Sequence, residues 1–384
     1  MSSPHGGSGT GPHVTRTPRE RVIVCGAIFP DHPRESEGEL TEIRGLIKAA
    51  EAEVVGDGIV QHLQRAHAAT LLGSGKVAEI KEEIGHHHAD AVVVDNDLSP
   101  AQVRNLEKAW CVRVIDRSEI ILDIFARRAK TRQARLQVEL AQNEYLLPRL
   151  RRMWTHLERT EGAIGTRGPG ETQLETDKRL LRKRVRDLRH ELKEIEARRV
   201  REMQSRSQAF TIGLVGYTNA GKSTLLNRLT DAEVLAADML FATLDTRTRR
   251  WKLQDGRVVL LSDTVGFLQR LPHHLVASFH ATLEETLYAD LLLHIVDASH
   301  PDAGHQMRAV NEVLGEMSSG ERSTILVFNK VDQVQDRLEL QLLRDDPTQE
   351  VVEVSAVTGA GLDELEAAVK RHLDSHSALL DVTL

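Results

Sequence analysis

The strongest chemical signal in the chain is the run GYTNAGKS at Gly216–Ser223. It fits the phosphate-binding pattern G-x-x-x-x-G-K-[ST], in which glycines let backbone N–H groups wrap phosphate oxygens ahead of a helix N-terminus. We expect Lys222 to carry a positive charge to the β- and γ-phosphates and the Ser223 hydroxyl to ligate Mg²⁺. The run therefore predicts a nucleoside triphosphate site. Its contact residues are Gly216, Tyr217, Thr218, Asn219, Ala220, Gly221, Lys222, Ser223 and Thr224.

Three shorter motifs follow in the order used by guanine-nucleotide proteins. Asp263 opens DTVG, where its carboxylate can hold Mg²⁺ through water and the Gly266 amide can contact the γ-phosphate. Asp332 closes NKVD and can accept two hydrogen bonds from guanine N1 and N2, which adenine cannot offer. A backbone N–H near Ser355 can meet guanine O6. The four motifs together predict GTP, and the contact set gains Asp263, Thr264, Val265, Gly266, Asn329, Lys330, Val331, Asp332, Ser355, Ala356 and Val357.

Short apolar runs must position these motifs. Each motif follows such a run, and ligands bind at the carboxyl ends of strands in open α/β sheets. The predicted strands are Phe210–Val215, Val258–Asp263, Leu291–Asp297, Thr324–Asn329 and Val351–Val354, with helices that include Thr224–Leu229 and Leu362–Leu373. We expect a P-loop GTPase domain over residues 208–376, with a parallel-rich sheet and helices on both faces.

A smaller α/β domain is expected at residues 20–126, after a disordered tail at 1–19. Apolar runs alternate with helical patterns, as in a parallel sheet covered on both faces. The predicted strands are Val22–Phe29, Ala91–Asp95 and Val112–Ile115. The predicted helices are Glu37–Glu53, Ser74–Ile84, Ser99–Trp110 and Ser118–Phe125, the last three with serine caps.

Between these domains, residues 127–207 predict a basic helical hairpin. Its first helix bends at Pro148, and its second has apolar residues at alternating spacings of four and three. Those residues are Leu181, Val185, Leu188, Leu192 and Ile195. The segment Gly162–Gly170 has four glycines and a proline and is placed as the linker at the tip. Residues 377–384 are expected to be a C-terminal tail.

Composition limits the partners and the compartment. The chain has 384 residues and a net charge of −7, yet residues 127–207 hold 22 Lys and Arg against 12 Asp and Glu. This basic segment predicts a polyanionic partner, with a merely solvated helical face as the alternative. Two cysteines, Cys25 and Cys111, cannot make a disulfide framework, and no apolar run is long enough for a membrane span. We expect a cytoplasmic monomer.

Beyond the nucleotide motifs, the chain resembles the HflX family of ribosome-associated GTPases. The resemblance is carried by RGPGETQLE at Arg167–Glu175, FATLD at Phe241–Asp245, LGSGK at Leu72–Lys76 and DRSEIILDIF at Asp116–Phe125. It implies a GTPase that binds GTP and GDP, associates with the large (50S) ribosomal subunit and dissociates stalled ribosomes under stress. It also implies that the first domain and the hairpin approach the peptidyl transferase region.

The resemblance also assigns roles within the site. Thr243 matches the switch threonine that joins Ser223 on Mg²⁺, and the γ-phosphate would order its segment, which is Phe241, Ala242, Thr243, Leu244 and Asp245. Catalysis would then rest on Lys222, Thr243, Gly266 and Asn219. Asn219 resembles the asparagine that holds K⁺ in potassium-activated GTPases, and a tolerant loop position explains it equally well.

Two features bear on partner dependence. Phe267 follows DTVG, where Ras-like proteins place a water-orienting glutamine, so we expect slow hydrolysis that the ribosome stimulates. Flexible basic segments suit folded rRNA, which is recognised through backbone, shape and unpaired bases. The rRNA-contact candidates are Arg149, Arg151, Arg152 and Arg167.

Two other functions stay open at this point. One is an ATP-dependent RNA-remodelling enzyme that works through the first domain, although Gly73–Lys76 departs from the phosphate-loop spacing. The other is a non-catalytic GTP-binding regulatory module, which Phe267 permits. We interpret His86–His88 as a solvated turn rather than a metal site.

Overall fold

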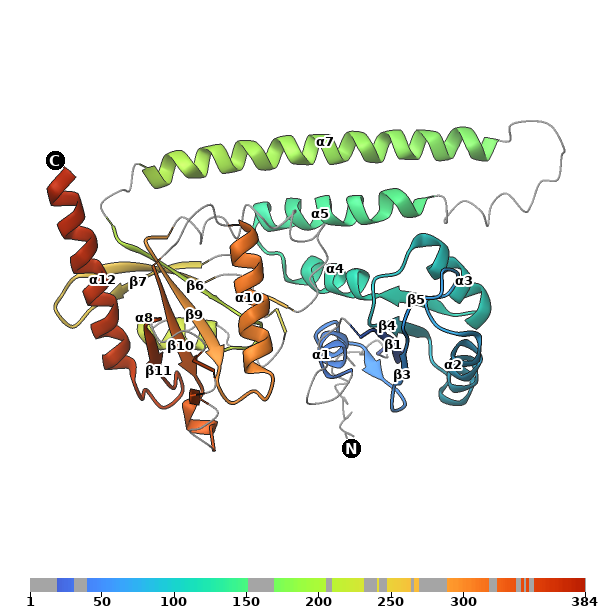
Figure 1. Ribbon diagram of the computed structural model, residues 1–384. Coiled ribbons are helices and arrows are strands. Elements are labelled where there is room, and N and C mark those ends of the chain that lie inside the picture. Colours follow the sequence, from blue (N-terminus) through green and yellow to red (C-terminus); the bar gives the residue numbers. More distant parts are fainter. Residues whose placement is uncertain are drawn as a thin grey trace, which may run out of the picture.

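The chain folds into two parallel-rich sheets beneath a pair of long helices (Figure 1). This computed structural model describes residues 19–30, 40–150, 169–204, 209–230, 240–241, 247–263, 266–268, 289–317, 323–335, 340–341, 343–344 and 349–383. Within these residues, no helix is both long and apolar enough to cross a membrane.

The first sheet is wholly parallel and buried on both faces. Its strand order is β2-β1-β4-β5, and β3 also pairs with β1. Alternate residues of β1 enter different cores, Val22 and Val24 with α1 and α4, Ile23 and Cys25 with α2 and α3. The elements are β1 (Arg21–Ile28), α1 (Thr41–Ala49), β2 (Glu53–Val54), β3 (Ile59–His62), α2 (Ser74–His87), β4 (Ala91–Val94), α3 (Pro100–Trp110), β5 (Arg113–Asp116) and α4 (Arg117–Arg128).

The first domain differs from the expected elements in three places. The helix expected over Glu37–Glu53 is described only as α1, and Glu53–Val54 pairs with β1 as a strand, while residues 37–39 lie outside the described residues. The short strand β3 was not predicted, because its four residues are two apolar ones followed by two polar ones, and they are only partly buried or exposed.

Helix capping confirms one of the three predicted serines. Ser99 caps α3 in a capping box with Gln102. Gly73, not Ser74, is the N-cap of α2, and Asp116, not Ser118, is the N-cap of α4. Asp116 is the N-cap because its carboxylate accepts a hydrogen bond from the Glu119 N–H at 2.8 Å.

The middle of the chain forms an antiparallel helix pair that joins the two sheets. α5 (Arg132–Leu146) gives way to a short 3-10 turn, η1 (Leu147–Arg149), at the predicted proline bend, and α7 spans Pro169–Gln204. Leu136 and Leu140 of α5 pack on Val185 and Leu188 of α7, as the spacing predicts. Residues 151–168 lie outside the described residues, and helix α7 already begins at Pro169, within the expected linker.

The second sheet has six strands in the order β11-β10-β9-β6-β8-β7, and β7 is antiparallel to β8. Its elements are β6 (Thr211–Gly216), α8 (Lys222–Thr230), β7 (Arg247–Lys252), β8 (Val258–Asp263), β9 (Leu291–Asp297), α10 (Ala303–Met317), β10 (Thr324–Asn329), η3 (Val331–Gln333), β11 (Val351–Glu353) and α12 (Leu362–Thr383). Helix α12 runs to Thr383 through the segment that we expected to be a tail.

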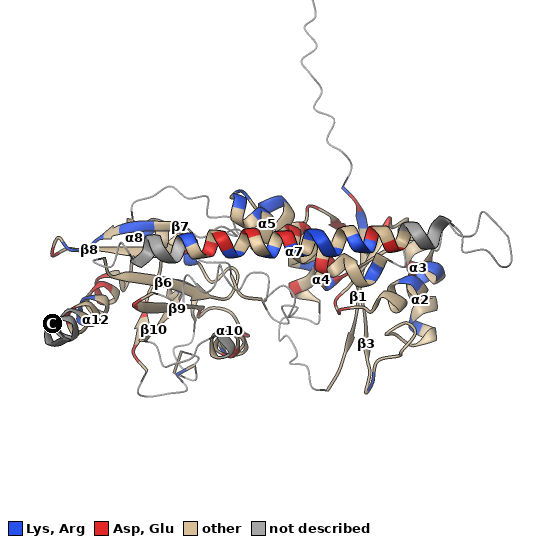
Figure 2. Cartoon of the chain, turned by 90° about the horizontal axis from the view of Figure 1, so that it is seen from above, with Lys and Arg blue, Asp and Glu red and all other residues tan. Residues whose placement is uncertain are grey.

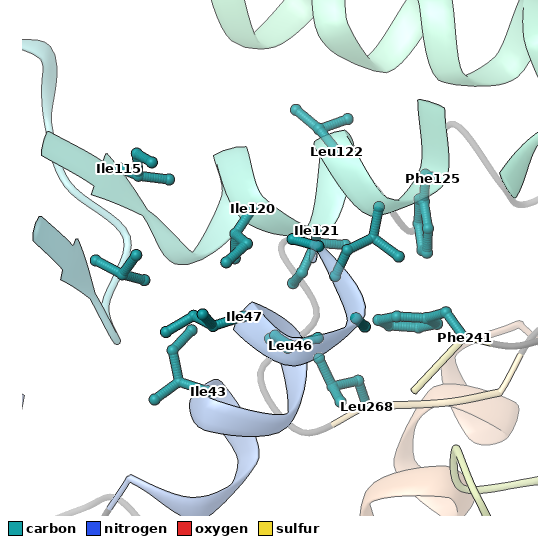
Figure 3. Close-up of a cluster of buried hydrophobic side chains, with 14 of the residues drawn as sticks. Ile43, Leu46, Ile47, Ile115, Ile120, Ile121, Leu122, Phe125, Phe241 and Leu268 are labelled. Atoms are coloured by element: carbon teal, nitrogen blue, oxygen red, sulfur yellow. The ribbon is translucent and has the colours of Figure 1, made fainter. Parts of the chain in front are cut away.

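The two sheets share one apolar core, the interdomain cluster. Buried residues of α1 and α4, among them Leu46 and Phe125, face Phe241 and Leu268 from the second half of the chain (Figure 3). Val215 of β6 and Val310 of α10 belong to the same cluster. The first domain therefore packs directly on the part of the second sheet that carries the phosphate-binding loop.

Candidate nucleotide-binding site

The phosphate-binding loop links β6 to α8, and its glycines are fixed by sterics. Gly216 has φ of +150°, and a Cβ there would lie 2.2 Å from the Ile295 carbonyl oxygen. Gly221 has φ of +91°, and a Cβ there would lie 2.2 Å from Asn329 Nδ2. Asn219 also adopts a left-handed backbone, with φ of +63°. Only glycine fits the first two positions, because any side chain would displace a neighbouring strand end.

Lys222 lies buried at the start of α8. Its ammonium donates to the carbonyl oxygens of Gly216 at 2.9 Å and Tyr217 at 2.8 Å. Burial lowers the pKa of Lys222 to about 8, and the Asp263 carboxylate partly opposes this change. The Lys222 side chain therefore points back into its own loop, and its ammonium lies close to where phosphate oxygens would bind.

Two oxygen donors meet beside this lysine. Ser223 Oγ donates to Asp263 Oδ2 at 2.8 Å, and the Asp263 residue is fully buried at the end of β8. A hydroxyl and a carboxylate are hard oxygen ligands, which suits Mg²⁺. Thr243, the other expected metal ligand, lies outside the described residues, as do Ala242, Leu244, Asp245, Thr264 and Val265.

Gly266 lies against the loop. A Cβ at Gly266 would stand 2.7 Å from Thr218 Cα and 3.1 Å from Lys222 Nζ. The following residue ties the two segments together, because Phe267 N donates to Gly216 O at 3.1 Å and Thr218 N donates to Phe267 O at 2.7 Å. The Gly266 backbone is thus close enough to Lys222 to share a ligand with it.

The base-recognition motifs also meet the loop. Asn329 Nδ2 donates to Ala220 O at 2.8 Å, and Asn329 Oδ1 accepts from Ala356 N at 3.0 Å. Asn329 therefore braces the phosphate loop against the last strand. Lys330 forms an ion pair with Asp297 at 2.5 Å and Asp332 is exposed at η3. Ser355 is buried and Val357 is exposed in the turn that follows β11.

The first domain reaches into the site through two contacts that the sequence did not reveal. Tyr217 of the phosphate loop donates its hydroxyl to Glu42 of α1, and Glu42 pairs with Arg117, which also pairs with Asp95 at 2.5 Å. Phe241 N donates to Thr218 Oγ1 at 3.0 Å, and its ring meets Phe125 edge-on at 4.7 Å between centroids.

Phe267 is buried in the same interdomain cluster, with 3% of its surface exposed. An apolar side chain has no group that could orient an attacking water. The structure therefore supplies no water-orienting side chain at this position.

Among the expected rRNA contacts, Arg149 is the one within the described residues. Its guanidinium pairs with the buried Asp116 at 3.0 Å, donates to Leu98 O at 2.8 Å and stacks on Tyr145 at 3.6 Å. Binding phosphate would require it to give up part of these contacts, and its role as an rRNA contact stays a prediction. Arg151, Arg152 and Arg167 lie outside the described residues.

The LGSGK run of the first domain does not form a phosphate loop. Gly73 caps α2, Ser74 begins that helix, and Lys76 pairs with Glu79 at 2.8 Å. A Walker lysine would point into its own loop instead.

Sequence comparison divides the chain into three matched regions. They are described as GTP-binding GTPase N-terminal (residues 37–126), GTP-binding GTPase Middle Region (128–206) and 50S ribosome-binding GTPase (211–330). GTPase HflX of Lacrimispora saccharolytica is 47% identical over 348 residues, covering 90% of this chain and 81% of that protein. The chain belongs to the HflX family. GTPase HflX of Escherichia coli K12 is 48% identical over 343 residues, covering 88% of this chain and 80% of its own.

A solved structure has a fold similar to that of this HflX-family chain. A crystal structure of SsGBP in complex with GDP matches with a TM-score of 0.52 and 22% identity. The match covers 92% of this chain and 98% of that one. The fold is therefore shared along nearly the whole length of a protein with much lower sequence identity.

Proposed function

We propose that the chain is a GTPase that binds the large ribosomal subunit and dissociates stalled ribosomes under stress. The observation that carries the proposal is the convergence of Lys222 and Ser223, at the start of α8, with Asp263 at the end of β8, in a chain of the HflX family. Action on the ribosome would place the chain in the cytoplasm, and we retain the monomer as its working state.

The chemistry follows from the groups around the loop. Backbone N–H groups and Lys222 would bind the phosphates, while Ser223, Asp263 and the switch residue Thr243 would hold Mg²⁺. Mg²⁺ when bound supplies charge for the developing negative oxygens. Gly266 would sense the γ-phosphate through its amide, and Asp332 would read guanine.

We propose that hydrolysis of GTP is slow in the isolated chain and is stimulated by the ribosome. With Phe267 buried in the interdomain cluster, no described side chain is placed as a general base. Electrostatic stabilisation from fixed donors is then the main resource of the isolated chain. K⁺ held near Asn219 would add to it, and equal turnover in K⁺ and Na⁺ would remove that part of the proposal.

The helix pair supplies a second surface for RNA. α7 exposes Arg179, Arg182, Lys183 and Arg186, which form no ion pair with described residues. Figure 2 shows basic residues interspersed with acidic ones along α7, with basic residues prevailing toward its N-terminal half. Such a stripe suits phosphate contacts that are sequence-independent and salt-sensitive.

GTP turnover with and without purified large ribosomal subunits tests the proposal, with Lys222→Ala as the control. We expect strong stimulation by the subunits and its loss in the variant. Tight GTP binding without stimulation would instead favour a regulatory module. RNA-stimulated ATP turnover that survives Lys222→Ala would favour RNA remodelling through the first domain.

A further inference from the structure

The edge strand β7 carries an unusual set of exposed cations. Its sequence is RTRRWK, and Arg249, Arg250 and Lys252 are exposed. β7 is the last strand of its sheet and pairs only with β8 among the described strands. The basic strand is visible beside β8 in Figure 2. One lysine is enough to discourage strand addition at a sheet edge, so three cations call for another explanation.

Trp251 fixes which face these cations occupy. It is 3% exposed and packs in the core with Leu225 and Leu226 of α8. Because side chains alternate along a strand, Arg250 and Lys252 project from the face opposite Trp251. The tryptophan thus anchors the strand and holds the two cations outward.

The neighbouring strand completes this outward face. Arg250 lies opposite Leu260, and Lys252 lies opposite Val258, which is 38% exposed. Leu260 is only partly buried. We call Arg250, Lys252 and Val258 the β7 surface. It is a flat sheet face with two charges about 7 Å apart along the strand.

The charges of the β7 surface are not neutralised within the described part of the chain. Neither the Arg250 nor the Lys252 side chain makes an ion pair or a hydrogen bond with a described residue, whereas their backbones pair with β8. Other cations of this domain do have acidic partners. The pairs are Arg257–Asp255, Arg344–Glu353, Lys370–Glu366 and Arg371–Glu350. In a chain of net charge −7, this local pair of free cations fits a polyanion.

We propose that the β7 surface binds the phosphate backbone of RNA. The inference rests on the proposed function, which supplies the ribosomal subunit as the source of that RNA. RNA phosphates are spaced regularly along a strand, so two cations on a flat extended element can contact neighbouring phosphates without reading sequence. Val258 would lie against the sugar edge between them.

The test is the salt dependence of binding to purified large ribosomal subunits, with the full chain and a non-hydrolysable GTP analogue. The variant is Arg250→Ala/Lys252→Ala. The matched control, Lys370→Ala/Arg371→Ala, removes the same charge from ion-paired positions on α12. GTP turnover without subunits should equal wild type in both, which verifies folding.

Loss of two phosphate contacts should reduce the slope of log affinity against log salt by about 1.4–1.8 in the β7 variant. The control should keep the wild-type slope. An unchanged affinity and slope in the β7 variant would overturn the inference and leave the proposed function intact. Weaker binding with an unchanged slope would overturn RNA as the partner in favour of a ribosomal protein. No binding by the wild type at any salt would overturn both.

Discussion

At the scale of a single residue, two opposing effects set the pKa of Lys222. Burial favours its neutral form, while two loop carbonyls and the Asp263 carboxylate favour the ammonium. The pKa of Lys222 is lowered to about 8 as a result. Phosphates entering the loop would restore the charge, because they place negative oxygens against the ammonium.

The affinity for GTP should therefore fall as the pH rises through about 8, by up to tenfold for each further pH unit. The empty loop then holds a neutral lysine that must regain a proton before it can pair with phosphate. Titration of a fluorescent GTP analogue from about pH 6.5 to 8.5 measures the onset of this change, in a range where guanine N1 keeps the proton that Asp332 would accept. Lys222→Arg keeps the charge and should give a flat profile. A flat wild-type profile would contradict the expectation.

The lowered pKa of Lys222 also affects the stability of the nucleotide-free protein. Stability changes with pH in the opposite direction to the affinity for GTP. Between pH about 8 and the ordinary lysine range, the unfolded chain binds more protons at this position than the folded one. The contribution of Lys222 to the free energy of unfolding therefore rises with pH across that window.

Asp116 and Arg149 form a buried pair whose role is structural. Burial raises the pKa of Asp116 to about 6, and the N–H of Glu119, Arg149 and Tyr145 oppose that change. Arg149→Met should lower the free energy of unfolding by about 3–5 kcal/mol near pH 8, because a buried carboxylate loses its cation. The destabilisation should be smaller at pH 5, because Asp116 is then protonated and leaves no unpaired buried charge.

Urea unfolding at the two pH values measures the effect. Arg132→Ala is a suitable control, because Arg132 is 79% exposed and its ion pair with Glu191 is long, at 3.4 Å. Unchanged stability of Arg149→Met, together with weaker ribosome binding, would return Arg149 to the RNA-contact set.

At the scale of elements, α1 is connected to the phosphate loop through the Tyr217–Glu42 hydrogen bond. Arg117 at the start of α4 pairs with the same carboxylate, so three elements share one charged network. A double-mutant cycle with Tyr217→Phe and Glu42→Met should give a coupling energy of about 1–3 kcal/mol in unfolding. Phe removes the donor and Met removes the acceptor, while the loss of the Arg117 partner is common to Glu42→Met and the double variant, so the cycle isolates the hydrogen bond. Additive effects would mean that the two side chains act independently.

Strands were predicted correctly from the sequence where the strand is buried, because a buried strand consists of a continuous apolar run. The strands β1, β4, β6, β8, β9 and β10 are apolar on both faces, and each was found within two residues. β7 was missed because an edge strand needs only Trp251 to be buried and fills its other positions with charge. A periodicity search cannot detect such a strand.

The candidate site divides in the same way. The residues that wrap the phosphate are contiguous, and their spacing is set by backbone geometry, so the sequence predicts them. The Tyr217–Glu42 contact joins positions 175 residues apart, and no local spacing encodes it. The pairing of Arg149 with Asp116 could not be predicted either, because a charge count cannot distinguish a cation in a buried pair from one in solvent.

At the scale of the whole molecule, the interdomain cluster should make the two sheets unfold together. Phe241 is 1% exposed and Phe125 is fully buried, so their contact belongs to a true core. We expect one calorimetric transition for the wild type. Phe241→Ala should cost about 3–5 kcal/mol and split that transition in two, since the cavity lies where the halves meet. Two separate transitions in the wild type would contradict a shared core.

The length of α7 sets a scale for any partner. Its 36 residues correspond to about 54 Å, and one end lies above the second sheet while the other extends past the first (Figure 1). The helix therefore acts as a ruler that keeps its N-terminal end and the GTP site a fixed distance apart. A single small domain, about 30 Å across, could contact one end at a time. A partner that contacts both the N-terminal end of α7 and the GTP site must itself extend over a distance of this order.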